Sequence, residues 1–255
     1  MSRPRRRPAP ISTVTAYTLV AGALAVVFVP PLALSALLPE TGPGSAWHWA
    51  GVATLTLALA LATTWRVTHL LGISVRDLGL APTWTRQPGL LARMDFQYQG
   101  LLVFGGALAL FLVPYSVTFL PGMLTLDVPT DATGHHLRTL WTIGPAQIAV
   151  AIAMELVLLG VVVTLAEAAR FPAWEVYLLS TVARTAFGAT VGWELLLLVP
   201  VAVGTVWLYR RTHLLTPIIA AHVVAALAQT AVAAWASWIS GAIYQPAFVF
   251  ILFPL

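Results

Sequence analysis

Three ionisable side chains lie within long apolar stretches of this chain. Glu155 is the one charged residue of IAVAIAMELVLLGVVV (148–163), Arg184 lies in LLSTVARTAFGAT (178–190) and His222 lies in TPIIAAHVVAA (216–226). A charge near the middle of a bilayer costs about 3 kcal/mol or more, so it needs an opposite charge, a proton or a function. A carboxylate and an imidazole together are also the groups that activate water in general acid–base catalysis.

The types of these three residues alone leave two interpretations open. In the first, Glu155 and Arg184 form a buried ion pair that fastens two helices, and His222 bonds a backbone carbonyl or a small-residue hydroxyl. In the second, all three are the remains of a site around an intramembrane water pocket. Removing one partner of such a pair would leave the other charge buried, at about 3–5 kcal/mol.

The composition identifies the surroundings of these residues as membrane. Hydrophobic residues make up 59% of the 255 residues and charged residues only 9%, and the mean hydropathy is +0.88. A soluble domain would be about one quarter charged. Spans of about 20 apolar residues, with no ten-residue alternating segments, predict an all-α polytopic membrane protein of seven to eight helices. The expected spans are 13–38, 48–70, 98–120, 141–166, 173–191, 194–209 and 214–238, and the hydrophobic tail 241–255 supplies the possible eighth, near 242–255.

The arginines predict the orientation of the chain. All 13 basic residues are arginines, and they gather in the N-terminal tail 1–12, in the second connection, and after the fourth and sixth spans. The alternate connections hold only Arg138. The positive-inside rule therefore predicts a cytoplasmic N terminus in the plasma membrane. The net charge of +4 reflects this anchoring, so we expect the lipid bilayer and no nucleic acid as a partner. The absence of cysteine excludes disulfides.

Two connections carry features of their own. Segment 71–97 is expected to be an interfacial helix, with apolar residues toward lipid and arginines toward headgroups; the residues expected to face lipid are Leu78, Leu80, Trp84, Leu90 and Leu91. The external connection 121–140 holds Asp127, Asp131, His135 and His136, which could bind a metal ion. Adjacent loop histidines usually do not, so we expect no cofactor.

The last third of the chain resembles a known family. The runs GTVWLYRRT (204–212) and PIIAAH (217–222) are similar to the final motif of the CAAX-protease and bacteriocin-processing (CPBP) family of intramembrane proteases. LGISVRDLGLAP (71–82) resembles that family's region between early helices. The resemblance implies a CPBP-type core over 141–240, preceded by N-terminal membrane helices over 13–140. It also implies an endopeptidase that acts on membrane-tethered peptides, such as prenylated chains.

The resemblance assigns roles to individual positions. Family members are thought to activate water with a glutamate of a Glu-Glu pair and a first histidine. A second histidine, with Asn or Asp four residues later on the same helix face, supports the transition state. In this chain Glu155 and His222 match, but Met154 replaces the first glutamate and Ala226 replaces the Asn or Asp.

The middle motif departs further from the family pattern. The best register matches Ser180, Arg184 and Phe187 and places Gly188 at the first histidine. A second register places Val191 there, so no histidine is found in either case. A metal would need three or four ligands, which cannot be assembled within the membrane from this sequence.

The incomplete site favours one function over two others. We expect a degenerate, non-catalytic member that binds a membrane peptide or a partner protein. An active endopeptidase that uses Glu155 and His222 is the first alternative. A small-solute transporter is the second, although the inverted repeats or paired broken helices that are typical of transporters are not evident.

Overall fold

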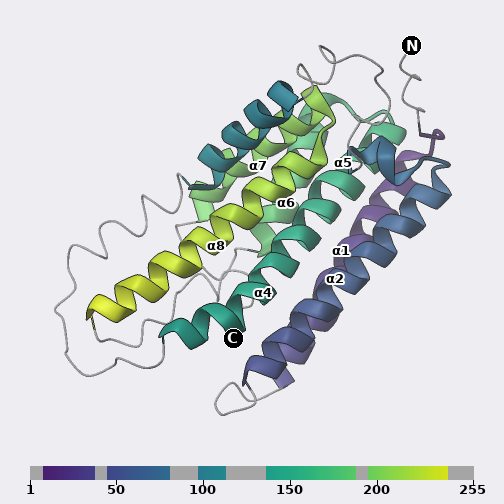
Figure 1. Cartoon of the computed structure of the whole chain (residues 1–255). Helices are drawn as coiled ribbons and strands as arrows, with labels where there is room; N and C mark the ends of the chain where they lie inside the picture. The colour runs from purple at the N-terminus through teal and green to yellow at the C-terminus, as the bar shows by residue number, and fades with distance from the viewer. Residues whose placement is uncertain (1–7, 38–44, 81–96, 113–135, 188–194, 241–255) are drawn as a thin grey trace.

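The chain folds into a bundle of helices (Figure 1). The computed structural model describes residues 8–37, 45–80, 97–112, 136–187 and 195–240, and none of these ranges contains a strand. The elements are α1 (Thr13–Leu37), α2 (Ser45–Leu70), the 3-10 turn η1 (Val75–Leu78), a helix over Gln97–Leu112, α4 (His136–Glu155), the π-helical segment η3 (Leu156–Val161), α5 (Val162–Ala168), α6 (Ala173–Phe187), α7 (Leu195–Thr212) and α8 (Leu215–Ser240). The predicted all-α class is confirmed for these residues.

Four helices are long and apolar enough to cross a membrane. Their apolar windows are Thr13–Leu34, Ala50–Leu70, Gly144–Ala168 and Leu215–Val232. This finding is consistent with a membrane protein, but the predicted seven to eight spans are not confirmed. The predicted span 173–191 corresponds to α6, which has 15 residues. At 1.5 Å per residue it covers about 22 Å, less than the ~30 Å hydrocarbon core. The tail 241–255 lies outside the described residues.

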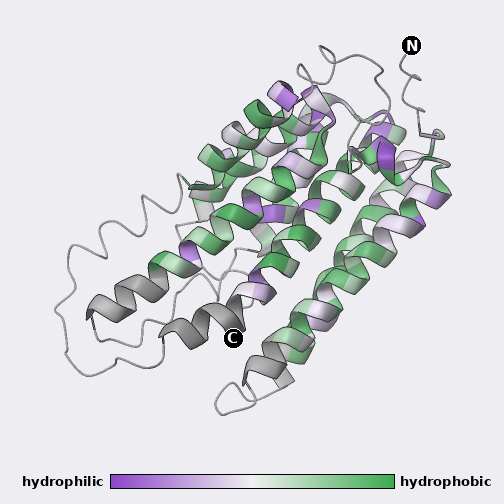
Figure 2. Cartoon of the chain, in the orientation of Figure 1, coloured by the Kyte–Doolittle hydropathy of each residue, from purple (hydrophilic) through white to green (hydrophobic). Residues whose placement is uncertain are grey.

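The window Gly144–Ala168 forms the centre of the bundle. Side chains inside the protein make up 89% of this window, against 28–39% for the other three. In Figure 1, α1 and α2 lie together on one side of it and α8 lies on the other. Figure 2 shows apolar residues along most of each helix and hydrophilic residues gathered at the end that carries the N terminus. The apolar outer faces suit lipid, and the central helix is shielded from it by its neighbours.

The expected interfacial helix over 71–97 is wrong for its described part. Residues 71–80 contain only the short turn η1, and Leu78 is 1% exposed in the protein core. Leu80 is half-buried against the same core. The remaining residues expected to face lipid, Trp84, Leu90 and Leu91, lie outside the described part of the chain. Apolar spacing does not distinguish a face that meets lipid from one that meets protein, which is why the prediction failed.

Segment η1 is held against the turn between α7 and α8. The backbone N–H of Thr216 donates to the carbonyl oxygen of Gly79 over 3.2 Å, and its hydroxyl donates to the same oxygen over 3.1 Å. The hydroxyl of Tyr209 donates to the carbonyl of Leu78 over 3.3 Å. Gly79 has φ of +78°, and a Cβ there would overlap the backbone carbonyl oxygen of His213. Only glycine fits both the backbone angle and the close approach.

Candidate functional site

Glu155 lies in the middle of the central span, where the backbone changes its hydrogen-bonding pattern. It is 11 residues from Gly144 and 13 from Ala168, or about 16 and 20 Å along the axis. The π-helical segment Leu156–Val161 begins immediately after it. π-helical turns are uncommon and occur frequently at functional sites. Within this segment the backbone carbonyl of Leu158 also accepts a hydrogen bond from the hydroxyl of Ser180 over 3.3 Å.

The Glu155 carboxylate is fully buried and hydrogen-bonded on both oxygens. Nη2 of Arg184 lies 2.7 Å from Oε1 and 2.8 Å from Oε2. Nδ1 of His222 lies 2.7 Å from Oε1. These three residues, here called the charged triad, join α4, α6 and α8. With a neutral imidazole the triad carries no net charge, which is the arrangement that a low-dielectric interior favours.

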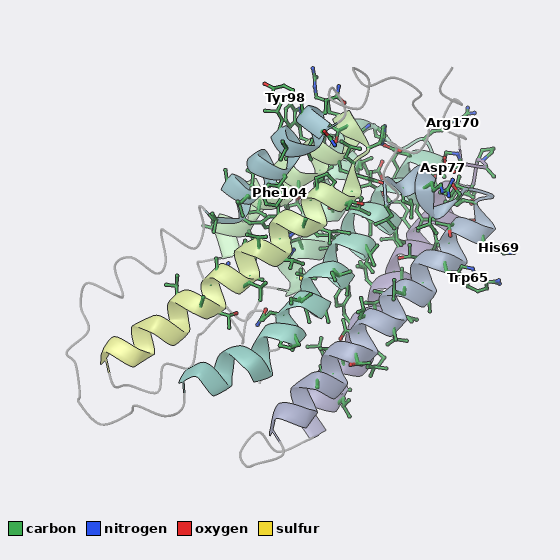
Figure 3. All side chains as sticks on the ribbon, in the orientation of Figure 1. Trp65, His69, Asp77, Tyr98, Phe104 and Arg170 are labelled. Carbon is green, nitrogen blue, oxygen red and sulfur yellow. The ribbon has the colours of Figure 1, made fainter. Side chains whose placement is uncertain are left out.

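An aromatic ring covers two members of the charged triad. Phe111 stacks on the imidazole of His222, with ring centroids 4.3 Å apart and planes inclined by 15°. Cζ of Arg184 lies 5.7 Å from the centroid of the same ring. Phe111 was not predicted from the sequence, because an aromatic residue in an apolar helix does not stand out from its neighbours. In the structure Val103, Ala107 and Phe111, spaced four residues apart, form a buried stripe. This stripe is the inner face of the helix Gln97–Leu112. Figure 3 labels two other residues of this helix, Tyr98 and Phe104.

The structure brings the three predicted residues together and decides between their predicted contacts. The predicted ion pair between Glu155 and Arg184 is confirmed. The expectation that His222 bonds a backbone carbonyl or a small hydroxyl is wrong for Nδ1, which bonds Glu155 instead. The reason is geometric, because α8 packs against α4 at the level of Glu155.

The other predicted site residues lie around the triad or outside the described part. Met154 is buried in a cluster that also contains Val27 and Phe28 of α1, whereas Phe111 belongs to a different cluster. Ala226 is buried one turn after His222, and its carbonyl accepts a hydrogen bond from Thr230.

The end of the middle motif and most of the external connection lie outside the described residues. Phe187 ends α6, and Gly188 and Val191 lie outside the described residues, as do Asp127, Asp131 and His135 of the external connection. Among the described residues, no group of three or more histidine, aspartate or glutamate side chains is placed to hold a metal ion.

One buried donor of the triad has no partner within the part of the chain that the structure describes. Nε of Arg184 is buried and has no hydrogen-bond partner among the described residues, although the side chain is only 4% exposed. A buried N–H that lacks an acceptor costs about 1–3 kcal/mol. The site can therefore hold a carboxylate firmly in place, while one buried donor beside it stays unsatisfied among the described residues. Comparisons with protein-family models, curated proteins and solved structures give no match for this chain.

Proposed function

We propose that this chain is a non-catalytic membrane protein of the CPBP type, in which the charged triad fixes three helices and helps to bind a membrane peptide or partner protein. The observation that carries the proposal is the double contact of Arg184 Nη2 with both oxygens of Glu155, at 2.7 and 2.8 Å. A general base must accept a proton from water at a free oxygen within hydrogen-bond reach. Here both oxygens already accept hydrogen bonds from the guanidinium, which competes with water for them.

The residues around the triad support the loss of catalysis. At the positions of the family's first glutamate and its Asn or Asp stand Met154 and Ala226, which carry no polar side-chain atom that could take part. Without these groups, water would be activated by a carboxylate that is already paired. The transition state would lack the donors that normally stabilise its oxyanion.

The unpartnered Nε of Arg184 supports a binding role. With a neutral imidazole the triad carries no net charge, and a neutral acceptor would then fit this donor better than an anion, whose charge would be uncompensated in the interior. The backbone carbonyl of an extended or unwound peptide segment is such an acceptor. Phe111, which lies against both His222 and Arg184, would supply apolar contact beside it.

An active endopeptidase remains the second candidate, because of one distance. Nδ1 of His222 lies 2.7 Å from Oε1 of Glu155, which is the contact expected of a carboxylate that orients a catalytic imidazole. In this mechanism Glu155 would position His222, and the other ring nitrogen would activate water. This role would require Glu155 to orient His222 while it remains paired with Arg184.

The same proposal includes a topology and a location. We infer seven to eight spans in the plasma membrane, in which the shorter helices Gln97–Leu112, α6 and α7 cross beside the four longer ones, although α6 by itself is shorter than the hydrocarbon core, and the N terminus lies in the cytoplasm. In Figure 3, His69, Asp77 and Arg170 lie toward the end of the bundle that also carries the N terminus. Arginines at that end, Arg66, Arg76, Arg170, Arg210 and Arg211, support this orientation.

Proteolysis in liposomes tests the loss of catalysis. We expect no cleavage of a library of hydrophobic and prenylated peptides by the wild-type protein. Cleavage that disappears in both Glu155→Ala and His222→Ala but persists in His69→Ala would overturn the proposal in favour of the endopeptidase. His69 is a suitable control because it is an exposed histidine on α2.

Photo-cross-linking tests the binding role. Transmembrane peptides that carry benzophenone are reconstituted with the protein, and cross-linked yield is compared between wild type and Arg184→Lys. Lysine keeps the charge opposite Glu155 but has no Nε–H, so we expect a reduced yield with a folded protein. An equal yield from both proteins, or no cross-link to the wild type, would contradict the binding role.

A further inference from the structure

Two adjacent arginines at the end of α7 are each held by an aromatic ring. Cζ of Arg210 lies 5.7 Å from the ring centroid of Tyr177 on α6. Cζ of Arg211 lies 5.8 Å from the centroid of Trp207, one turn earlier on α7. Contacts of this kind orient the guanidinium plane and leave its edge N–H groups available to an anion.

The two arginines are only partly neutralised. Nε of Arg210 lies 3.7 Å from Oε1 of Glu167, and both side chains are about one quarter exposed, so this pair is weak. Arg211 is exposed, and no carboxylate in the described part of the chain lies within ion-pair distance of it. Glu175, in the first turn of α6, already accepts a hydrogen bond from the hydroxyl of Tyr17. The set of Arg210, Arg211 and Glu167 therefore carries one positive charge in excess.

Exposed tryptophans mark the depth of this region. Trp207 is 50% exposed and Trp174, one turn before Tyr177 on α6, is 65% exposed. Tryptophan is enriched where the headgroup region meets the acyl chains, because the ring is apolar and its N–H is polar. A phosphate held by the arginines would therefore lie at headgroup level, with the tryptophans beside the first carbons of the acyl chains.

We propose that this region, which we call the α6–α7 arginine site, binds the phosphodiester of an anionic phospholipid. The site comprises Arg210 and Arg211 with the aromatic side chains of Trp174, Tyr177 and Trp207. Guanidinium groups donate two parallel hydrogen bonds to phosphate oxygens. In a zwitterionic lipid the ammonium or choline group of the lipid competes with the arginines for the phosphate, so such a lipid should bind less tightly. In the topology proposed above, this end of the bundle faces the cytoplasm, and basic residues between helices on that side are a known way of recognising anionic headgroups. The site does not depend on peptide binding at the charged triad.

Lipid titration of the purified full-length protein tests the proposal. Thermal unfolding in detergent and native mass spectrometry are recorded with phosphatidylglycerol and with phosphatidylcholine of the same acyl chains. We expect phosphatidylglycerol to raise the melting temperature and to bind more tightly. Removing one arginine with Arg211→Gln should weaken this binding roughly fivefold, the effect of about 1 kcal/mol per basic residue near the surface. Because Arg211 is exposed, this variant should fold normally.

The control variant is Arg66→Gln, which removes an exposed arginine that follows the exposed Trp65 on α2. It should leave phosphatidylglycerol affinity unchanged. If both variants weaken phosphatidylglycerol binding equally, the lipid is attracted by the positive charge of this whole end of the bundle. That result would overturn the proposal of a specific site. Equal affinity for both lipids would do the same. Inorganic phosphate is included as a further probe: stabilisation by phosphate as large as that by the lipid would contradict recognition of a lipid.

Discussion

The charged triad and the η1 contact both hold helices together with polar groups, but they do so in different ways. The triad joins α4, α6 and α8 through three ionisable side chains, all less than 10% exposed. The η1 contact joins Leu78 and Gly79 to α7 and α8 through neutral donors and backbone carbonyls. The triad should therefore be sensitive to a change of charge, whereas the η1 contact should be sensitive to added volume. The binding role that we propose rests on the triad and not on the η1 contact.

The largest effect should come from removing one charge of the triad. Arg184→Ala leaves the Glu155 carboxylate buried without its counter-charge, and we expect a loss of about 3–5 kcal/mol in the free energy of unfolding. Thermal melting in detergent and unfolding by sodium dodecyl sulfate would measure it. An unchanged expression level and melting temperature would count heavily against the ion pair as a structural element.

A double-mutant cycle separates the pair from the cavities that the substitutions leave. Glu155→Ala with Arg184→Ala removes both charges, so the double variant should be more stable than the sum of the two single losses predicts. We expect a coupling energy of about 2 kcal/mol or more, within the range for contacting buried groups. Additive losses would mean that Glu155 is stabilised mainly by His222.

The next largest effect should come from added volume at the η1 contact. Gly79→Ala places a methyl group against the backbone of His213 and 2.8 Å from the backbone nitrogen of Leu215, at φ of +78°. We expect a loss of at least about 2 kcal/mol, from strain in the left-handed region together with the clash. Thermal melting of the purified variant would measure it.

Gly72→Ala is the matched control for this clash. Gly72 also has a positive φ, +65°, but a Cβ there meets no atom within 4 Å. It should show only the backbone strain, about 1 kcal/mol. Equal losses at both positions would show that Gly79 is needed for its backbone angle alone, and the close contact with the α7–α8 turn would then contribute little to stability.

A smaller effect is expected from a single hydroxyl of the η1 contact. Tyr209→Phe removes the donor to the Leu78 carbonyl but keeps the fully buried ring. The carbonyl loses its hydrogen-bond donor, and we expect about 1 kcal/mol of destabilisation in thermal melting. Tyr98→Phe is the control, because Tyr98 is 63% exposed and its hydroxyl should contribute nothing measurable. If Tyr209→Phe leaves the melting temperature unchanged, the hydrogen bonds from Thr216 account for the stability of the η1 contact.

The two regions also differ in how far the sequence predicted them. Glu155, Arg184 and His222 could be grouped in advance because buried charges in lipid have few possible partners, and each of the three stood out against apolar neighbours. Phe111 could not, because an aromatic residue in an apolar helix carries no such signal. Gly79 could not either, since its need for glycine arises from the approach of His213, which is distant in the chain. Leu78 was misplaced because lipid and protein core select the same residue types.

The smallest predicted effect concerns the π-helical segment that follows Glu155. Ser180→Ala removes the hydroxyl that donates to the Leu158 carbonyl at 3.3 Å, and interhelical hydrogen bonds in membranes average about 0.6 kcal/mol. Thr54→Ala is the control, because its hydroxyl bonds the carbonyl of Ala50 within its own exposed helix turn. If Ser180→Ala lowers the melting temperature and Thr54→Ala does not, the hydroxyl stabilises the widened turn. A loss in Ser180→Ala that also weakens peptide cross-linking would show that this turn helps to set the position of the triad, because Leu158 lies only three residues beyond Glu155.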